Sequence, residues 1–335
     1  MSISRRLFLT QTFGFSAAAL LAGRVAPSLA MEPPGPEFLR PDGPSAHLLA
    51  LGDFGVKKSD LSRQRAVADG MARYLARENI RPDALALLGD NFYGGLGRAG
   101  VDSSRWLSNI ESMYPAPAFP CPMYALLGNH DYHDGGGSVA AQLEYGRRRS
   151  RWTMPGKWYR FDFGADERAL ATVLVIDTNF VFAGGLSRAE RQKQGVWLAD
   201  QLSAKRKTPF VFVLGHHPVY SGGSHGDTQK LVELLDPLLR RHKVDLYLCG
   251  HDHDLQHIEF NNHPTSFVVS GAGGARARET RERKNGAFAR AVYGFTHLEV
   301  RPDRFTVRHV DANGATLHAF TKTAEGRVTA GVVAA

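Results

Sequence analysis

The most regular feature of the sequence is a series of short apolar runs that each stop at a polar turn. The first run, in HLLALGDFG at 47–55, ends at an aspartate and a glycine, and the second, in DALALLGD at 83–90, ends in the same way. Apolar runs of this length, bounded by turn-forming residues, are typical of buried β-strands. The pattern predicts four further strands of this kind, in the segments 122–131, 169–179, 209–218 and 244–253.

Helical periodicity separates some of these runs. Residues 60–79 place Val67, Met71, Tyr74 and Leu75 on one face of a helix, and a strand, a helix and a strand in succession build parallel sheets. A second helix is predicted around 228–242, and strands are predicted at 265–274 and in a hairpin at 295–310. We therefore predict one α/β domain over 45–325, with more strand than a simple doubly wound sheet, and a short tail at 326–335.

The clusters at the strand ends contain carboxylate, amide, phenol and imidazole groups. In open α/β sheets the carboxyl ends of the strands line the ligand crevice, so we expect these groups to converge in space. A single aspartate after a strand is more often a turn residue, and the prediction therefore depends on the whole set. Hard oxygen and imidazole donors of this kind suit hydrolytic sites with two metal ions about 3.5 to 4 Å apart. The candidates are Asp53, Asp90, Tyr93, Asn129, His130, His216, His251 and His253.

Composition and charge restrict the possible partners only slightly. The 335 residues are 43% hydrophobic and carry a formal net charge of +8, which is an ordinary globular composition with a basic balance. The surplus could attract anionic substrates or could belong to a mixed solvated surface. The basic segments 146–151 and 276–284 lack interleaved aromatic residues and any nucleic-acid-binding motif, so we interpret them as solvated loops and expect no nucleic-acid partner.

The first thirty residues have the features of an export signal. Arg5 and Arg6 precede the apolar stretch 13–22, and Ser28-Leu29-Ala30 fits a small-x-small cleavage site. The pattern SRRxFL resembles the signal of the twin-arginine route, which exports folded proteins, although paired arginines also occur in ordinary secretory signals. We predict a twin-arginine signal peptide at 1–30, a linker at 31–44, and a periplasmic or secreted protein. No other stretch approaches the roughly 18 to 20 apolar residues of a membrane span, so we expect no stable membrane anchor.

The chain has two cysteines, whose state would depend on whether the compartment is oxidising. Cys121 and Cys249 could form one disulfide in an oxidising environment or remain two buried thiols, and the sequence favours neither.

Five clusters, taken in order as DFG, GDNFY, GNHD, VLGH and GHDH, match the series that defines the purple acid phosphatases of the metallophosphoesterase superfamily. The chain is most similar to the short mammalian, tartrate-resistant type, in KVDLYLCGHDHDLQ, GHHPVYSGGSHG and RWTMPGKWYRFDF. The resemblance covers most of 45–310. It implies the calcineurin-like metallophosphoesterase fold, an α/β fold in which two mixed β-sheets pack as a sandwich flanked by helices, in four layers.

The resemblance also implies a dinuclear metal centre. Carried over by position, three residues would hold a trivalent iron: Asp53, Tyr93 and His253. Three others would hold a divalent ion, which is iron, zinc or manganese in the family: Asn129, His216 and His251. Asp90 would bridge the two ions.

Tyr93 is the residue that separates this type from relatives with two divalent ions. A phenolate adds one negative charge, which balances the extra positive charge of a ferric ion, and the ferric ion in turn keeps the phenol ionised far below its usual pKa of about 10. The alternative for Tyr93 is a core tyrosine with a hydrogen-bonded hydroxyl. The four other motifs favour the ligand.

The implied activity is hydrolysis of small-molecule phosphoric monoesters by a metal-bound hydroxide, with an optimum on the acid side because a trivalent ion acidifies water strongly. His130 and His225 are the implied catalytic residues near the leaving oxygen. Asp131 could orient His130 or serve only in a turn. His217 is interpreted as a wall of the substrate pocket, and other histidines without a role are expected on the surface: His133, His257 and His263.

Three alternatives come from other classes of function. The chain could hydrolyse phosphodiesters or nucleotide pyrophosphates, bind phosphate or act as a scaffold without catalysis, or carry out redox chemistry at the iron. The expected partners are a phosphomonoester substrate and the twin-arginine export machinery, and the oligomeric state is not specified by the sequence.

Overall fold

The computed structural model describes residues 45–57, 61–148, 151–165, 168–281 and 286–331, all of which belong to one compact unit. The expected signal peptide at 1–30 and linker at 31–44 lie outside the described residues. Within the described ranges, no helix is both long enough and apolar enough to cross a membrane.

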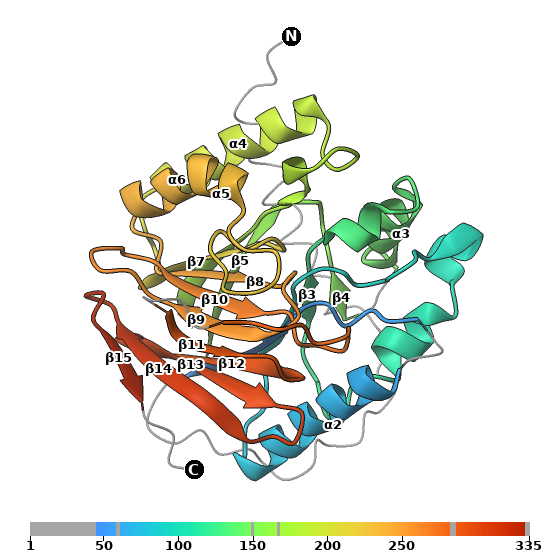
Figure 1. Cartoon of the computed structure of the whole chain (residues 1–335), viewed down its shortest axis with the longest axis horizontal. Helices are drawn as coiled ribbons and strands as arrows, with labels where there is room; N and C mark the ends of the chain where they lie inside the picture. The colour runs from blue at the N-terminus through green and yellow to red at the C-terminus, as the bar shows by residue number, and fades with distance from the viewer. Residues whose placement is uncertain (1–44, 58–60, 149–150, 166–167, 282–285, 332–335) are drawn as a thin grey trace. The chain divides into compact units, whose positions relative to one another are not determined.

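Two mixed β-sheets form the centre of the described chain (Figure 1). In the first sheet β1 to β4 run parallel, as the strand-helix-strand pattern predicts, and the C-terminal strands add to β1 in antiparallel fashion. The order in space is β15 (Val328–Gly331), β14 (Thr316–Thr323), β13 (Arg304–Asp311), β12 (Gly294–Val300), β1 (Ala46–Leu51), β2 (Ala84–Leu87), β3 (Met123–Ala125) and β4 (Trp152–Thr153).

The second sheet has a parallel centre and antiparallel edges. Strands β6, β7, β8 and β10 are parallel neighbours, while β5 and β9 pair antiparallel. The order in space is β11 (Gly286–Arg290), β9 (Leu255–Ile258), β10 (Ser266–Ser270), β8 (Leu246–Cys249), β7 (Phe210–Leu214), β6 (Arg168–Val175) and β5 (Tyr159–Ala165).

The alternation of side chains along each strand divides the core into layers. On β1, Leu48 packs between the two sheets with Phe212 of β7, whereas Leu49 packs on the opposite face with Met71 of helix α2 (Ser62–Arg77). On β7, Val213 packs against the helices that cover the second sheet. Apolar residues on both faces of the central strands thus produce helix, sheet, sheet and helix layers, and the predicted four-layer α/β fold is confirmed.

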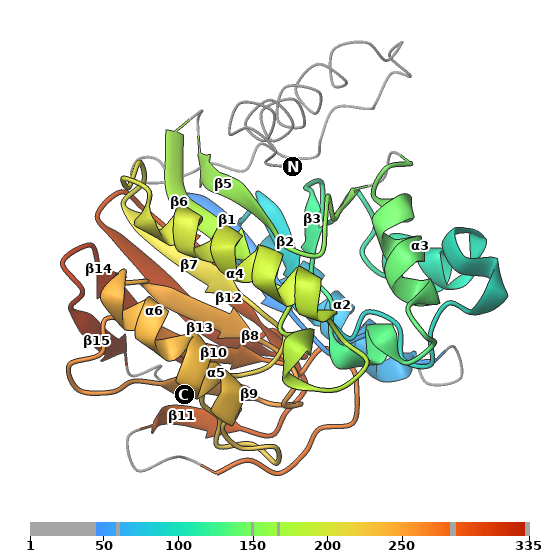
Figure 2. The same ribbon diagram turned by 90° about the horizontal axis from the view of Figure 1, so that it is seen from above.

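The helices cover the outer faces of the sheets. Helix α2 lies on the first sheet, and Figure 2 shows α4, α5 and α6 along one face of the second. The helix predicted around 228–242 is two helices that meet at Leu235, because Pro237 fits only the first turn of a helix. The remaining helices and helical turns are α3 (Gly137–Tyr145), α4 (Arg188–Ser203), α5 (Gln229–Leu234), α6 (Asp236–Arg241), η2 (Gly97–Asp102), η3 (Trp106–Glu111), η4 (Asn129–Tyr132) and η5 (Asn179–Val181).

The structure corrects the expected C-terminal boundary of the domain and the expected surface positions of two histidines. Strand β15 pairs with β14, so the sheet continues beyond residue 325 and its last strand, Val328–Gly331, lies within the expected tail at 326–335. His257 and His263 are buried rather than on the surface, and each Nε2–H donates to a nearby carboxylate: Glu259 lies 2.8 Å from His257 Nε2 and Asp236 lies 2.7 Å from His263 Nε2.

The two cysteines are free. Cys121 and Cys249 are both buried thiols, so the possible disulfide is not formed. Burial raises the pKa of the Cys121 thiol to about 12, which keeps it protonated and unreactive at neutral pH.

Candidate metal centre

The loops that follow β1, β2 and β3 of the first sheet meet those that follow β7 and β8 of the second. The seven residues predicted as metal ligands stand on these loops, and the contacts described below bring all seven together. The centre is therefore built across the two sheets, by residues that are far apart in the sequence.

One group of donor atoms surrounds Asp53. The Tyr93 hydroxyl lies 3.3 Å from Asp53 Oδ1 and 3.1 Å from His253 Nε2. His253 Nε2 itself lies 3.5 Å from Asp53 Oδ1. A carboxylate, a phenol and an imidazole thus point to one location, which is the set predicted for the trivalent ion.

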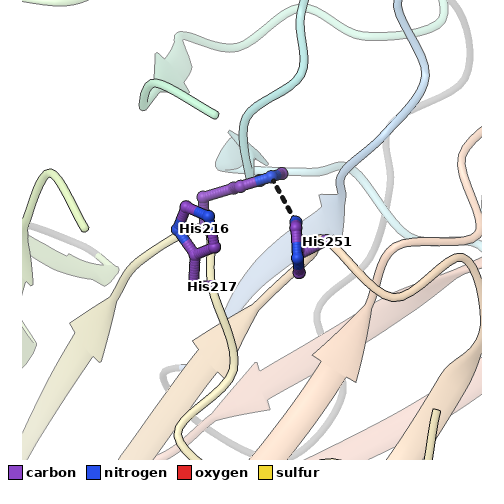
Figure 3. Close-up of side chains that lie close together, drawn as sticks. All are labelled: His216, His217 and His251. Atoms are coloured by element: carbon purple, nitrogen blue, oxygen red, sulfur yellow. Dashed lines mark hydrogen bonds between the residues drawn. The ribbon is translucent and has the colours of Figure 1, made fainter. Parts of the chain in front are cut away.

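A second group surrounds the side-chain oxygen of Asn129. His216 Nε2 and His251 Nδ1 each lie 3.1 Å from Asn129 Oδ1, and 3.3 Å from one another. Figure 3 shows the rings of His216 and His251 directed toward each other from different loops. This is the set predicted for the divalent ion.

Asp90 lies between the two groups. Its Oδ1 is 3.4 Å from His216 Nε2 of the second group. Ligand atoms of Asp53, Asp90 and His216 all lie within 4.8 Å of one another. The carboxylate is almost fully buried, at 1% exposure, and it accepts a 2.8 Å hydrogen bond from the His130 N–H, which fixes its orientation. Its position fits the predicted bridge.

Hydrogen bonds on the outer side of the rings leave lone pairs facing inward. His216 Nδ1 lies 2.8 Å from the Leu88 carbonyl and His253 Nδ1 lies 2.8 Å from the Arg276 carbonyl, so each Nδ1 must carry the proton that it donates. Each Nε2 then presents a lone pair to carboxylate and amide oxygens, and acceptors that face acceptors repel unless a cation lies between them. The donor set therefore fits two cations, and outer hydrogen bonds of this type orient histidine ligands in metal sites.

The backbone at three of these residues takes a conformation that most side chains avoid. Asp53, Asp90 and His251 have φ of 59°, 53° and 71°. Aspartate and histidine tolerate this left-handed region better than most residues, and such strain is concentrated at functional sites. Gly55 of DFG has a different reason to be glycine, because a Cβ there would lie 2.0 Å from the Asn91 carbonyl oxygen.

Burial raises the pKa values of the acidic ligands Asp90 and Tyr93 and lowers that of His251, so the metal-free site favours their neutral forms. Burial and then the Asp53 charge raise the pKa of Asp90 and also that of the Tyr93 phenol. Burial and the neighbouring His216 lower the pKa of His251. At His253, burial would lower the pKa, but the Asp53 carboxylate raises it overall. The unligated centre thus disfavours its own anions, and bound cations would reverse this.

Asp131 holds two ligand loops together. Its buried carboxylate accepts hydrogen bonds from the backbone N–H groups of Asn91, Phe92 and Gly128, at 2.9 to 3.1 Å, and from Gln142 Nε2. Burial and the Asp90 charge raise the pKa of Asp131 to about 7. Of the two roles considered for Asp131, the turn role is the one observed, and it extends to fixing the loop of Asp90 against the loop of Asn129.

The two predicted catalytic histidines border the donor groups. The His130 ring lies 4.3 Å from the Tyr93 ring, and its Nε2 lies 3.9 Å from Asp90 Oδ2. The His225 ring lies 4.2 Å from the His251 ring. Both side chains are about one-third exposed, so both can be reached from solvent. Burial and the nearby His133, which is exposed as expected, lower the pKa of His130 to about 4.

His217 is buried behind this border. Its Nδ1 lies 2.8 Å from the Thr178 hydroxyl, and its ring lies 4.4 Å from that of His251 (Figure 3). One ligand atom each of His216, His217 and His251 lies within 4.8 Å of the others. The Thr178 hydroxyl also accepts from the His217 backbone N–H, so one hydroxyl is hydrogen-bonded to both the ring and the backbone of His217. These two contacts hold the buried ring in place beside His251.

The sequence analysis missed two side chains that contact His225. Asp252 Oδ1 lies 2.7 Å from His225 Nδ1, and Arg278 NH1 lies 2.7 Å from His225 Nε2. Asp252 is the residue between the two histidines of GHDH, and that position was the available signal. Arg278 belongs to the basic segment 276–284, which was interpreted as a solvated loop, and its described part instead reaches the site.

Comparisons with known proteins agree with this geometry. The model of the family described as calcineurin-like phosphoesterase matches residues 46–255. The chain is similar to "Tartrate-resistant acid phosphatase type 5" of Mus musculus, with 33% identity over 82% of this chain and 89% of the mouse protein. It is also similar to "Purple acid phosphatase 4" of Arabidopsis thaliana, with 30% identity over 83% of each chain.

A solved structure shares the fold at somewhat lower sequence identity. This structure is described as "GAP50 the anchor in the inner membrane complex of Plasmodium". It superposes with a TM-score of 0.72 and 25% identity, over 83% of this chain and 88% of that chain.

Proposed function

Because this chain belongs to the calcineurin-like phosphoesterases and, within them, to the tartrate-resistant and purple acid phosphatases, we propose that it hydrolyses phosphoric monoesters at a dinuclear Fe(III)–M(II) centre. The curated relatives are named acid phosphatases, which are phosphoric monoester hydrolases. The identity of the two metals, the nucleophile and the site of action are the parts of the function that we propose here.

The observation that carries the proposal is the grouping of Tyr93 with Asp53 and His253. The phenol oxygen lies within 3.3 Å of a carboxylate oxygen and within 3.1 Å of an imidazole lone pair. A core tyrosine would direct its hydroxyl to one acceptor, whereas Tyr93 directs it into a cluster of donor atoms. This arrangement supports a phenolate ligand, whose charge suits a trivalent ion.

When bound, the two cations would neutralise the phosphate and lower the pKa of a water molecule that serves as the nucleophile. The protein residues supply the remaining parts of the reaction. The Asp90 carboxylate fixes the separation of the two ligand groups, and the Asp131 hydrogen bonds hold its loop in place. His130 and His225 stand at the solvent side, where an imidazole can stabilise or protonate the departing alkoxide. Asp53, Tyr93 and His253 would hold the trivalent ion, which would keep the nucleophile available in acid, so the activity should peak below neutral pH.

The proposed site of action is outside the cytoplasm. The pattern SRRxFL and the cleavage site at Ser28-Leu29-Ala30 support export by the twin-arginine route. That route transports folded proteins, which suits a centre assembled from residues on both sheets.

The test is a metal analysis of the purified protein, together with a visible spectrum and a comparison of p-nitrophenyl phosphate with bis(p-nitrophenyl) phosphate. We expect iron with a second metal, a tyrosinate-to-iron absorption band, and much faster hydrolysis of the monoester. A colourless protein with two divalent ions would refute the ferric assignment, and faster hydrolysis of the bis ester would favour the phosphodiesterase alternative. A metal-loaded protein that hydrolyses neither ester would instead point to a binding role.

A further inference from the structure

The basic loop 276–281 is hydrogen-bonded to two loops of the metal centre. One follows β8 and carries His251 and His253, and the other follows β7 and carries His216 and His225. At one end, the Arg276 carbonyl accepts from His253 Nδ1 at 2.8 Å, and the Arg278 N–H donates to the His253 carbonyl at 3.3 Å. At the other end, the Arg281 N–H donates to the Gly222 carbonyl at 3.0 Å, three residues before His225. A loop held at both ends by backbone hydrogen bonds has a defined position beside the metal centre.

Arg278 is the side chain of this loop that faces the site. Its NH1 lies 2.7 Å from His225 Nε2 and 3.4 Å from His225 Nδ1, so the guanidinium lies against the imidazole. The His225 ring in turn lies 4.2 Å from the ring of His251. The guanidinium is therefore one imidazole away from the second ligand group, and Arg278 as a whole residue is half-buried.

Within the part of the chain that the structure describes, the Arg278 guanidinium has no carboxylate partner. Asp252, which contacts the same histidine, uses its oxygens for His225 and for the Ser221 hydroxyl. Glu279 is exposed, and no ion pair joins it to Arg278 among the described residues. An arginine held beside an active centre without an anion of its own is suited to bind one from a ligand, because its planar fork matches phosphate and carboxylate oxygens.

We propose that Arg278 is a specificity-determining residue that binds a second anionic group on the substrate, beyond the phosphate that is cleaved. The inference rests on the proposed phosphomonoesterase function and names its preferred substrate class: phosphoric monoesters whose alcohol part carries a phosphate, phosphonate or carboxylate. His225 supports the guanidinium from behind, and Arg276 and Arg281 add positive charge around it. The anionic end of the substrate would extend from the second ligand group over His225 toward the loop.

The experiment compares two substrates with the same scissile bond, propyl phosphate and 3-phosphonopropyl phosphate. In the metal-loaded wild-type enzyme, kcat/KM should be on the order of tenfold higher for the phosphonate-bearing ester, mainly through KM, since a hydrogen-bonded ion pair of this kind is worth about 1.5 kcal/mol. The preference should shrink as the ionic strength rises toward 1 M. Arg278→Gln should lower kcat/KM for 3-phosphonopropyl phosphate about tenfold more than for propyl phosphate, so that the preference is lost, and Arg278→Lys should retain part of the preference.

A matched control separates local binding from the general positive field. Arg191 is exposed on α4, a different element, and Arg191→Gln removes the same charge outside the loop, so it should leave the preference intact. Equal hydrolysis of the two esters by the wild type, or an equal loss for both in Arg278→Gln, would overturn the inference while the phosphatase function stands. Hydrolysis of neither ester by the metal-loaded protein would remove the proposed function and this inference with it.

Discussion

The hydroxyl oxygen of Tyr93 lies 3.1 Å from Nε2 of His253, although the two residues come from different sheets. The contact joins the end of β2 to the end of β8 at the location where Asp53 also points. A hydroxyl and an imidazole lone pair in this arrangement can share one metal ion, and the function of Tyr93 can be tested by removing a single oxygen atom.

We expect Tyr93→Phe to lose the visible colour of the protein and most of its trivalent iron, because the phenolate ligand is gone while the ring still packs against His130. Hydrolysis should fall at acidic pH first, since a divalent ion in that position acidifies water less. The visible spectrum and the metal content per chain, measured together, check this. A variant that kept both its colour and its iron would show that Tyr93 is not a ligand.

Asp90→Asn should have opposite effects on activity and on the stability of the metal-free protein. The carboxylate is buried beside Asp53, so an uncompensated negative charge is removed, and the metal-free variant should be about 1 to 3 kcal/mol more stable than the metal-free wild type. The same change should abolish binding of the two metal ions and reduce kcat by at least about a thousandfold. Urea unfolding in a chelator and metal titration test the two halves. Equal stability of both chelated proteins would contradict the role of buried charge.

Gly128→Ala should damage the centre without touching a ligand. A Cβ at residue 128 would lie 2.2 Å from Asp90 Oδ1 and 2.3 Å from the Asp90 nitrogen, so the bridging carboxylate would have to move. We expect a large loss of kcat together with a loss of bound metal. Gly195→Ala is the matched control, because residue 195 is inside α4 with nothing within 4 Å of its Cβ, and this change should raise stability by about 0.5 to 1 kcal/mol. Full metal occupancy in Gly128→Ala would mean that the loop can relax.

Three buried histidines on the C-terminal strands β12, β13 and β14 of the first sheet should make the protein less stable in acid. Burial and His257 lower the pKa of His318 to about 4, and burial also lowers the pKa values of His297 and His309. The unfolded chain, with histidine pKa values near 6.5, binds more protons than the folded protein between about pH 6.5 and 4. Stability should therefore fall as the pH is lowered through that window.

His318→Asn should reduce this pH dependence, by about 1 kcal/mol between pH 7 and 5 after a discount for the partial contact of the ring with solvent. Urea unfolding of the wild type and the variant at both pH values gives the difference directly. Identical pH slopes in the two proteins would assign the acid sensitivity to other groups.

The central strands and the ligand residues could be predicted because each is encoded locally. An apolar run followed by glycine and a polar donor specifies both a buried strand and the residue at its end, and the parallel order of such strands brings those ends to one place. Helix α2 was predictable for a similar reason, since Val67 and Met71 lie four residues apart on one face.

Features that depend on distant packing could not be predicted. Strand β15 has four residues and lies at the edge of the sheet beside β14, and so short a segment has too few residues for a clear strand pattern. The burial of His257 depends on its contact with His318, which is 61 residues away. The position of Arg278 depends on backbone hydrogen bonds to His253, and a run of arginines carries no sign of them.

The sequence positions of the ligands also have a consequence for the order of events during synthesis. The donors begin at Asp53 and end at His253, and the orientation of His253 further requires the carbonyl of Arg276. A nascent chain on the ribosome cannot offer a complete site until the chain through Arg276 has emerged. Binding of the two metal ions is thus a late step, and a product truncated before His253 would lack one of the seven ligands.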